Sequence, residues 1–310
     1  MNHSNAPTDA NPGLAHPLIN LALQGGGSHG AFTWGVLDAL LEDGRIDIEG
    51  LSGTSAGAMN AVVLAHGLAA AQGQPRAARN DAAREALGKF WTGIVEMGAL
   101  SSTVSQSLSE WQRAPFGVLF GQLGGGIWSR ASSSWSDEVA RFWSGNLSPY
   151  QSNPFDINPL KDFLESQVDF GRLAAAPHPL TPKVFVVATR VSTGKAEVFT
   201  GKRLTADAVM ASACLPTVFQ AVKIEGDHFW DGGYTGNPAL HPLLYECKSR
   251  DIMLVQINPI ERAELPTQPG EIADRVNEIT FNAGLVAEMR AIDFVKRLLA
   301  EGKLDPAQYK

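Results

Sequence analysis

The chain has 310 residues, of which 44% are hydrophobic and 18% are charged, below the share of about a quarter usual in soluble domains. This composition excludes an intrinsically disordered chain, which combines low hydrophobicity with high charge. The net charge of −7 argues against a protein that binds nucleic acid through bulk positive charge. Two stretches, 50–75 and 114–129, carry no charged side chain.

The start of the chain and its cysteines bear on the compartment. Residues 1–17 are polar and lack the positive start and apolar core of a signal peptide, so we expect a disordered leader. The two cysteines, Cys214 and Cys247, are too few for a disulfide framework. No apolar run reaches the roughly 20 residues of a transmembrane helix. These features predict a cytoplasmic protein, at most peripheral to a membrane.

The first predicted unit is a strand, a glycine-rich loop and a helix. The apolar run 18–23 is typical of a strand, and residues 31–42 have apolar side chains at helical spacing. Between them lies the loop Gly25-Gly26-Gly27-Ser28-His29-Gly30. Successive glycines before a helix leave backbone N–H groups free to bind a negatively charged oxygen.

This glycine loop formally matches the dinucleotide-binding pattern G-x-G-x-x-G. That function requires an acidic residue at the end of the next strand, about 20 residues on, but the strand there ends in Gly53-Thr54-Ser55. An oxyanion hole for acyl transfer fits the loop equally well, so both alternatives remain at this point. The absence of a Gly-Lys-Ser/Thr sequence excludes a P-loop.

The second predicted unit repeats this order and carries the pattern G-x-S-x-G. A strand at 46–51 and a helix at 58–71, apolar nearly all round and therefore buried, flank Gly53-Thr54-Ser55-Ala56-Gly57. A serine is a weak nucleophile that needs an exposed turn, a base and donors for the oxyanion. Flanking glycines permit such an elbow, so Ser55 is the candidate nucleophile. A tight turn without chemistry is the alternative.

The remaining elements complete an α/β pattern. Two successive strand–loop–helix units predict parallel strands. Helices are further expected at 81–97, 158–168, 205–213 and 271–300, and strands at 184–187, 197–200, 220–224 and 252–257, the last of them buried. The last helix carries an apolar stripe that we expect to pack on the same domain; a surface for a partner is the alternative. The stripe consists of Ile272, Val276, Ile279, Val286, Met289, Ile292, Val295 and Leu299.

The segment 98–158 is irregular and rich in aromatic residues, serine and glycine. We expect an aromatic insertion that serves as a lid or as a wall for an acyl chain, or that transiently contacts a membrane surface. An ordinary core insertion is the alternative.

The base that would activate Ser55 is not evident from spacing. Of the seven histidines, only His241 follows the best acid candidate, Asp231, and it precedes another core strand, which makes a Ser–Asp–His triad awkward. Asp231 lies after a strand and is followed by Gly232 and Gly233. Asp-Gly turns are common without any function, but a carboxylate within hydrogen-bond reach of a nucleophile can act as a general base.

Together these motifs resemble the patatin-like phospholipases. That family has a glycine-rich oxyanion motif, then G-x-S-x-G, then D-G-A/G, and the chain has them in this order at Gly25–Gly30, Gly53–Gly57 and Asp231–Gly233. The segment Ala211–Pro216 is similar to the family's A-S-x-x-x-P sequence. The resemblance covers residues 19–241.

The resemblance implies a three-layer α/β/α fold with a mostly parallel central sheet. It implies a catalytic domain over 18–245, with 246–310 forming a final strand and a helical extension. Ser55 would be the nucleophile and Asp231 the base of a dyad without catalytic histidine, metal or cofactor. Backbone N–H groups around Gly26 and Gly27 would bind the oxyanion.

The implied reaction is hydrolysis of carboxylic esters in a lipid or phospholipid, as by a phospholipase A, a lysophospholipase or an esterase, through an acyl-enzyme. No nucleic-acid partner is expected. A nucleotide- or dinucleotide-binding protein and an inactive patatin-like interaction module are the alternatives.

His29 departs from the family pattern, which usually has Arg or Lys before the last glycine of the loop. A fixed charge is thereby replaced by a titratable one. We hypothesise that His29 modulates the oxyanion loop; a histidine that only shapes the loop is the alternative.

Overall fold

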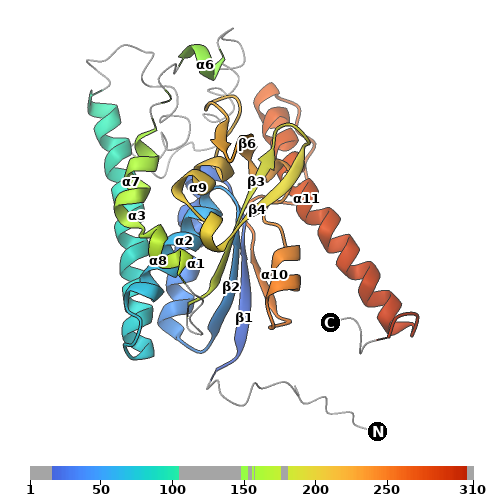
Figure 1. Cartoon of the computed structure of the whole chain (residues 1–310). Helices are drawn as coiled ribbons and strands as arrows, with labels where there is room; N and C mark the ends of the chain where they lie inside the picture. Colours follow the sequence, from blue (N-terminus) through green and yellow to red (C-terminus); the bar gives the residue numbers. More distant parts are fainter. Residues whose placement is uncertain (1–15, 105–147, 153–155, 157, 176–180, 306–310) are drawn as a thin grey trace.

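The computed structural model describes residues 16–104, 148–152, 156, 158–175 and 181–305 (Figure 1). The predicted leader, 1–17, falls mostly outside the described residues and stays a prediction. Most of the predicted aromatic insertion, 98–158, does so too, but its first residues, 98–104, belong to a regular helix and not to an irregular segment. Among the described residues, no helix is both long enough and apolar enough to cross a membrane.

The described part is built on a seven-stranded sheet with the order β5-β6-β3-β2-β1-β7, and β4 pairs with β3 off this path. The strands are β1 (Leu18–Leu23), β2 (Asp47–Gly53), β3 (Lys183–Arg190), β4 (Lys195–Phe199), β5 (Val222–Ile224), β6 (Asp227–Asp231) and β7 (Ile252–Val255). The pairs β7–β1, β1–β2 and β2–β3 are parallel. The pairs β3–β4, β3–β6 and β5–β6 are antiparallel. The sheet is therefore mixed and parallel at its centre.

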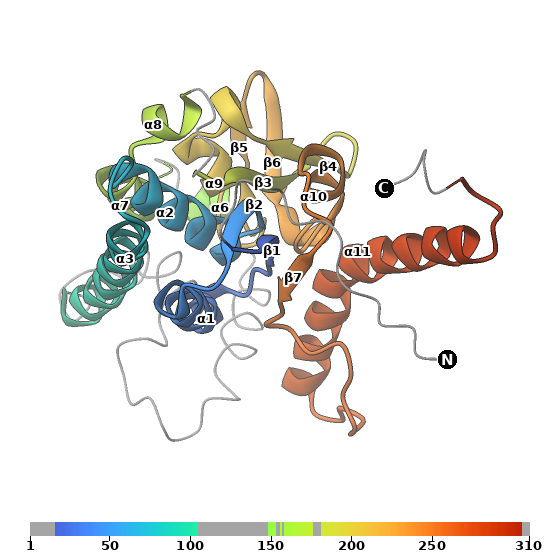
Figure 2. The same ribbon diagram turned by 90° about the horizontal axis from the view of Figure 1, so that it is seen from below.

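Helices cover both faces of the sheet (Figures 1 and 2). The helices are α1 (Gly30–Asp43), α2 (Ala56–Ala70), α3 (Arg76–Val104), α6 (Pro149–Ser152), α7 (Pro159–Gln167), α8 (Phe170–Ala174), α9 (Ala206–Ser212), α10 (His241–Glu246) and α11 (Pro269–Ala300). The described residues also contain the 3-10 turns η1 (Gly27–His29), η3 (Gly201–Arg203) and η4 (Gly232–Tyr234). Helices α1–α3 and α7–α9 lie on one face, and α10 and α11 on the other.

The alternation of side chains along β1 explains the three layers. Leu21 and Leu23 are buried in the larger core under α1–α3, whereas Ala22 points to a smaller core that includes Leu243 of α10 and Leu285 of α11. Since successive residues of a strand face opposite sides, a strand covered on both faces is mostly apolar, and the buried polar residue of β1, Asn20, donates a hydrogen bond to the Ser249 carbonyl. The predicted α/β fold with three layers is confirmed.

Two expectations about single elements were wrong in detail. The strand predicted at 252–257 is not fully buried, because β7 lies at the sheet edge and Met253 is 39% exposed. The helix predicted at 81–97 is part of α3, which already begins at Arg76.

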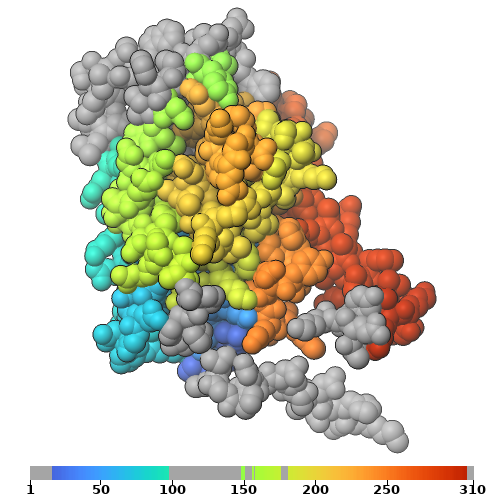
Figure 3. All heavy atoms as spheres, viewed as in Figure 1, coloured from blue at the N-terminus to red at the C-terminus, as the bar shows by residue number. Residues whose placement is uncertain are grey.

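Most of the apolar stripe predicted for the last helix is exposed, although Ile292 packs against the smaller core. Ile272, Val276 and Ile279 are about half exposed, whereas the buried residues of α11 are Asn282 and Leu285. The second half of α11 extends away from the sheet (Figures 2 and 3), and Phe294 there is 61% exposed. Hydrophobic periodicity did not predict the packing face of α11, because this helix contacts the core through a polar and a small residue as well as through apolar ones.

The register of β3 decides where the candidate site forms. Val186 of β3 pairs with Gly53, the last residue of β2, so β3 continues for four more residues beyond the end of β2. Strand β6 pairs antiparallel with this overhang and returns toward the sheet until Asp231 lies opposite Ala188. Asp231 therefore reaches the level at which the chain leaves β2 and enters the turn at Ser55.

Candidate active site

Ser55 occupies a strained turn between β2 and α2. Its backbone angles are φ 54° and ψ −122°, a combination that residues with a side chain rarely adopt. The turn is held by a hydrogen bond from the Ser55 N–H to Ser212 Oγ at the end of α9, at 2.9 Å. A strained serine between strand and helix is the geometry of a nucleophile elbow.

Glycines allow three stretches of backbone to meet at this elbow. A Cβ on Gly25 would lie 2.5 Å from the Thr54 carbonyl oxygen and 2.8 Å from Ser55 Cβ. A Cβ on Gly53 would lie 2.5 Å from the Gly57 carbonyl oxygen, and one on Gly57 would overlap the Leu23 carbonyl. The glycine spacing of both motifs therefore reflects close packing of the oxyanion loop against the elbow.

Gly57→Ala should therefore destabilise the fold. The new methyl group would overlap backbone that cannot move aside, and overpacking of this kind costs about 1–3 kcal/mol or more. The control is Gly35→Ala on α1, where a Cβ meets open space and alanine should stabilise the helix by about 1 kcal/mol. Urea unfolding of both variants measures the difference. Equal stability of the two would contradict the close approach.

Asp231, the last residue of β6, is buried with 1% of its surface exposed. Its carboxyl group accepts a hydrogen bond from the Gly233 N–H at 2.7 Å. Burial raises the pKa of Asp231 to about 7, and the Gly233 N–H and the Ser55 side chain oppose this rise. The candidate nucleophile is thus near enough to the candidate base to influence its pKa.

The backbone on both sides of Asp231 is also fixed. Its N–H donates to the Cys214 carbonyl at 2.7 Å, and its carbonyl accepts from Thr189 Oγ1 at 2.8 Å. A Cβ on Gly232 would overlap the Val187 carbonyl and lie 3.0 Å from Thr54 Cγ2. Glycine at this position therefore lets η4 cross the end of β3 toward the elbow.

The glycine loop after β1 is held in place by hydrogen bonds to the backbone of Gly25. The Gly25 N–H donates to Asn237 Oδ1 at 2.7 Å, and the Gly25 carbonyl accepts from Asn258 Nδ2 at 3.0 Å. Within the described part of the chain, the N–H groups of Gly26 and Gly27 have no such partner. Of the predicted loop, these two residues therefore offer free donors, whereas Gly25 does not.

His29 contributes to the shape of this loop. Its ring Nδ1 lies 3.1 Å from the Gly26 carbonyl oxygen, which also accepts from the His29 N–H at 3.2 Å. The His29 side chain is otherwise exposed.

No histidine among the described residues hydrogen-bonds to Ser55 or Asp231. His241 pairs instead with Glu288 of α11, at 2.8 Å. His66 Nδ1 accepts from the Asp169 N–H, and burial lowers the pKa of His66. Likewise, the described residues contain no group of three His, Cys, Asp or Glu placed to hold a metal ion.

Several residues of the site were missed by the sequence analysis. Ser212 lies in the quoted segment Ala211–Pro216, but its bond to the elbow was not foreseen. Gln24, Asn237 and Asn282 form a buried amide group next to Gly25. Single amide residues do not produce a periodic pattern in the sequence. The one sequence feature that could have pointed to Gln24 is that it is a lone polar residue directly after a buried strand.

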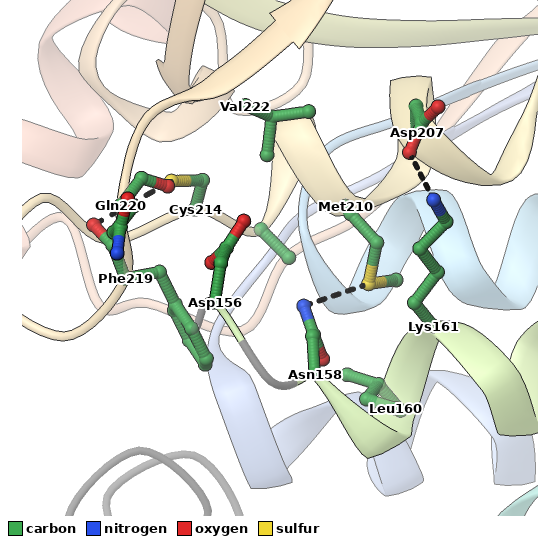
Figure 4. A pocket seen from close by; sticks show the side chains of 11 residues that line it. Asp156, Asn158, Leu160, Lys161, Asp207, Met210, Cys214, Phe219, Gln220 and Val222 are labelled. Carbon is green, nitrogen blue, oxygen red and sulfur yellow. Dashed lines mark hydrogen bonds and ion pairs between the residues drawn. The ribbon is translucent and has the colours of Figure 1, made fainter. Parts of the chain in front are cut away.

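A separate cavity of about 130 Å³ lies between α7, α9 and the start of β5 (Figure 4). Lys161 and Asp207 form an ion pair at 2.7 Å on its wall, and neither Ser55 nor Asp231 lines it. Cys214, which does line it, is buried, and burial raises the pKa of its thiol to about 12. This thiol is therefore a poor nucleophile.

A strained serine elbow at the carboxyl edge of a layered α/β sheet is typical of the large class of α/β proteins that hydrolyse esters. Within that class, the family model of the patatin-like phospholipases matches residues 21–244. The chain belongs to this family, whose members act on lipids.

Matches to individual proteins are distant. Among solved structures, the chain is similar to VipD from Legionella pneumophila, with 19% identity and a TM-score of 0.36. The match covers 69% of this chain and 46% of that chain, so the chain spans less than half the length of VipD. No curated protein matches the chain significantly.

Proposed function

We propose that the protein hydrolyses carboxylic esters of lipids through a Ser55–Asp231 dyad and an acyl-enzyme intermediate. The observation that carries this proposal is the position of Ser55, on a strained turn, beside the buried carboxyl of Asp231, whose pKa the Ser55 side chain lowers. Membership of the patatin-like phospholipase family supports a lipid as the substrate.

In the first half-reaction, the Asp231 carboxylate accepts the proton of the Ser55 hydroxyl while Oγ attacks the ester carbonyl. The N–H groups of Gly26 and Gly27 donate to the oxyanion of the tetrahedral intermediate. Collapse breaks the bond to the alcohol, which leaves with the proton held by Asp231. In the second half-reaction a water molecule, deprotonated by Asp231, attacks the acyl-enzyme, and the fatty acid leaves as Ser55 regains its proton.

The burial of Asp231 explains how a carboxylate can act without histidine. A general base is most effective when its pKa lies near the working pH, and an ordinary aspartate, with a pKa near 4, is too weak a base. Burial raises the pKa of Asp231 to about 7. Its fixed backbone and the Gly233 N–H keep the carboxyl oriented toward Ser55.

The direct test is the release of acid from esters by the purified protein. We expect hydrolysis of p-nitrophenyl esters, and of phospholipid in mixed micelles to fatty acid and lysophospholipid. Addition of EDTA should leave the rate unchanged. Tight binding of NAD without hydrolysis of any ester would instead favour the dinucleotide-binding alternative.

A further inference from the structure

Helix α11 lies outside residues 21–244, which match the family model, yet it contacts both halves of the candidate site. On the side of Asp231, a Cβ on Gly233 would overlap the Phe281 ring, and a Cβ on Gly284 would lie 2.5 Å from the Thr235 carbonyl oxygen. The rings of Tyr234 and Phe281 are 5.1 Å apart. The turn η4 therefore rests directly on α11.

On the side of the oxyanion loop, the contact runs through the side chain of Gln24, the residue before Gly25. Gln24 is fully buried, and its amide group is saturated with hydrogen bonds. Its Oε1 accepts from the N–H groups of Ile257 and Asn258, both at 2.7 Å. Its Nε2 donates to Asn282 Oδ1 at 2.8 Å and to the Asn237 carbonyl at 3.3 Å.

Asn282 of α11 completes this network. It is 4% exposed, and its Nδ2 donates to the Pro259 carbonyl at 3.1 Å. Buried amides that lose a partner cost about 1–3 kcal/mol each, so Gln24 and Asn282 hold each other in one arrangement. Asn237 and Asn258, which bond to Gln24, also grip Gly25.

We propose that Asn282 and Gln24 are positioning residues through which α11 fixes the conformation of the oxyanion loop. The chain of contacts runs from Asn282 through Gln24 to Gly25, and it leaves the next two N–H groups, of Gly26 and Gly27, as the free donors. This role rests on the proposed function, because a loop without an oxyanion to bind needs no such alignment. Misplacement of a catalytic group by about 1 Å can lower a rate a hundredfold.

The test uses Asn282→Leu, which keeps the size of the side chain and removes its hydrogen bonds. The matched control is Asn277→Ala, on the exposed side of the same helix. The number of active sites in each sample is counted by the stoichiometry of fluorophosphonate labelling, which separates loss of folded protein from slower turnover. Hydrogen exchange of residues 24–30 reports the loop without requiring activity.

In Asn282→Leu we expect kcat per active site to fall about ten- to a hundredfold with KM nearly unchanged, since the bound ester carries no oxyanion and the negative charge develops only as the tetrahedral intermediate forms. Exchange of residues 24–30 should rise about tenfold. The control variant should have the kcat and the hydrogen-exchange rate of the wild type. Unchanged kcat per site, or unchanged exchange, would overturn the inference. A wild-type protein that does not hydrolyse esters would overturn the proposed function instead, and this role of α11 with it.

Discussion

Ser55→Ala should abolish ester hydrolysis, lowering kcat/KM by about 10⁴-fold or more while the protein stays folded, as is found when a serine nucleophile is removed. The methyl group cannot form the acyl-enzyme, and the strained backbone at Ser55 remains the same. Loss of the hydroxyl should also raise the pKa of Asp231 further, because the Ser55 side chain lowers it. Initial rates on a p-nitrophenyl ester measure the effect.

The matched control is Ser192→Ala, an exposed serine in the turn between β3 and β4. This variant should keep the wild-type rate. Residual activity above about 1% in Ser55→Ala would show that another group performs the attack, since removal of a true nucleophile leaves far less.

Asp231→Asn should lower kcat/KM by about 10³-fold, because general-base catalysis contributes about 10²–10⁴-fold and an amide cannot accept the proton. In the wild-type protein, kcat/KM should fall about tenfold per pH unit below pH 7, as the carboxylate is protonated. This acid limb should be absent from the residual activity of Asp231→Asn. The control Asp162→Asn, on the exposed side of α7, should keep the wild-type rate and the same fall in kcat/KM below pH 7.

The same substitution should stabilise the protein at higher pH. The pKa of Asp231 rises from 3.8 to about 7 on folding, so the folded state holds the proton more tightly than the unfolded chain does. The resulting contribution to stability is complete below pH 3.8 and is lost as the pH rises through 7. Because asparagine does not titrate, the free energy of unfolding of Asp231→Asn relative to wild type should increase by a few kcal/mol between pH 4 and pH 8. Urea unfolding at both pH values measures this increase. A difference in free energy of unfolding between variant and wild type that is the same at both pH values would contradict a raised pKa of Asp231.

Much of the fold follows from local patterns in the chain. The apolar run 18–23 and the strand pattern at 46–51, each followed by glycines and a helix, predicted the two parallel units that hold the site. Short elements such as α8 and α10 were missed, since four to six residues show no clear period. The true packing face of α11 was also missed, because Asn282 and Gly284 contact the core through hydrogen bonding and close approach.

The candidate site was predictable to a different degree. Glycine spacing identified the elbow and the loop, but spacing alone did not connect Ser55 with Asp231, which lie 176 positions apart. That pairing depends on the register by which β6 returns along the overhang of β3, and register is a tertiary property. The resemblance to the patatin-like phospholipases supplied the pairing, whereas Ser212, Gln24 and Asn282 became visible only in the structure.

The central claim, that Ser55 is activated by Asp231, is tested most directly by mapping a fluorophosphonate label on the protein. Peptide mass spectrometry should find one adduct, on Ser55, and its rate of formation should rise with pH to a plateau, with a midpoint near pH 7 set by Asp231. A label on another residue, labelling that survives in Ser55→Ala, or a rate in the wild type that does not change between pH 5 and pH 8 would contradict the account.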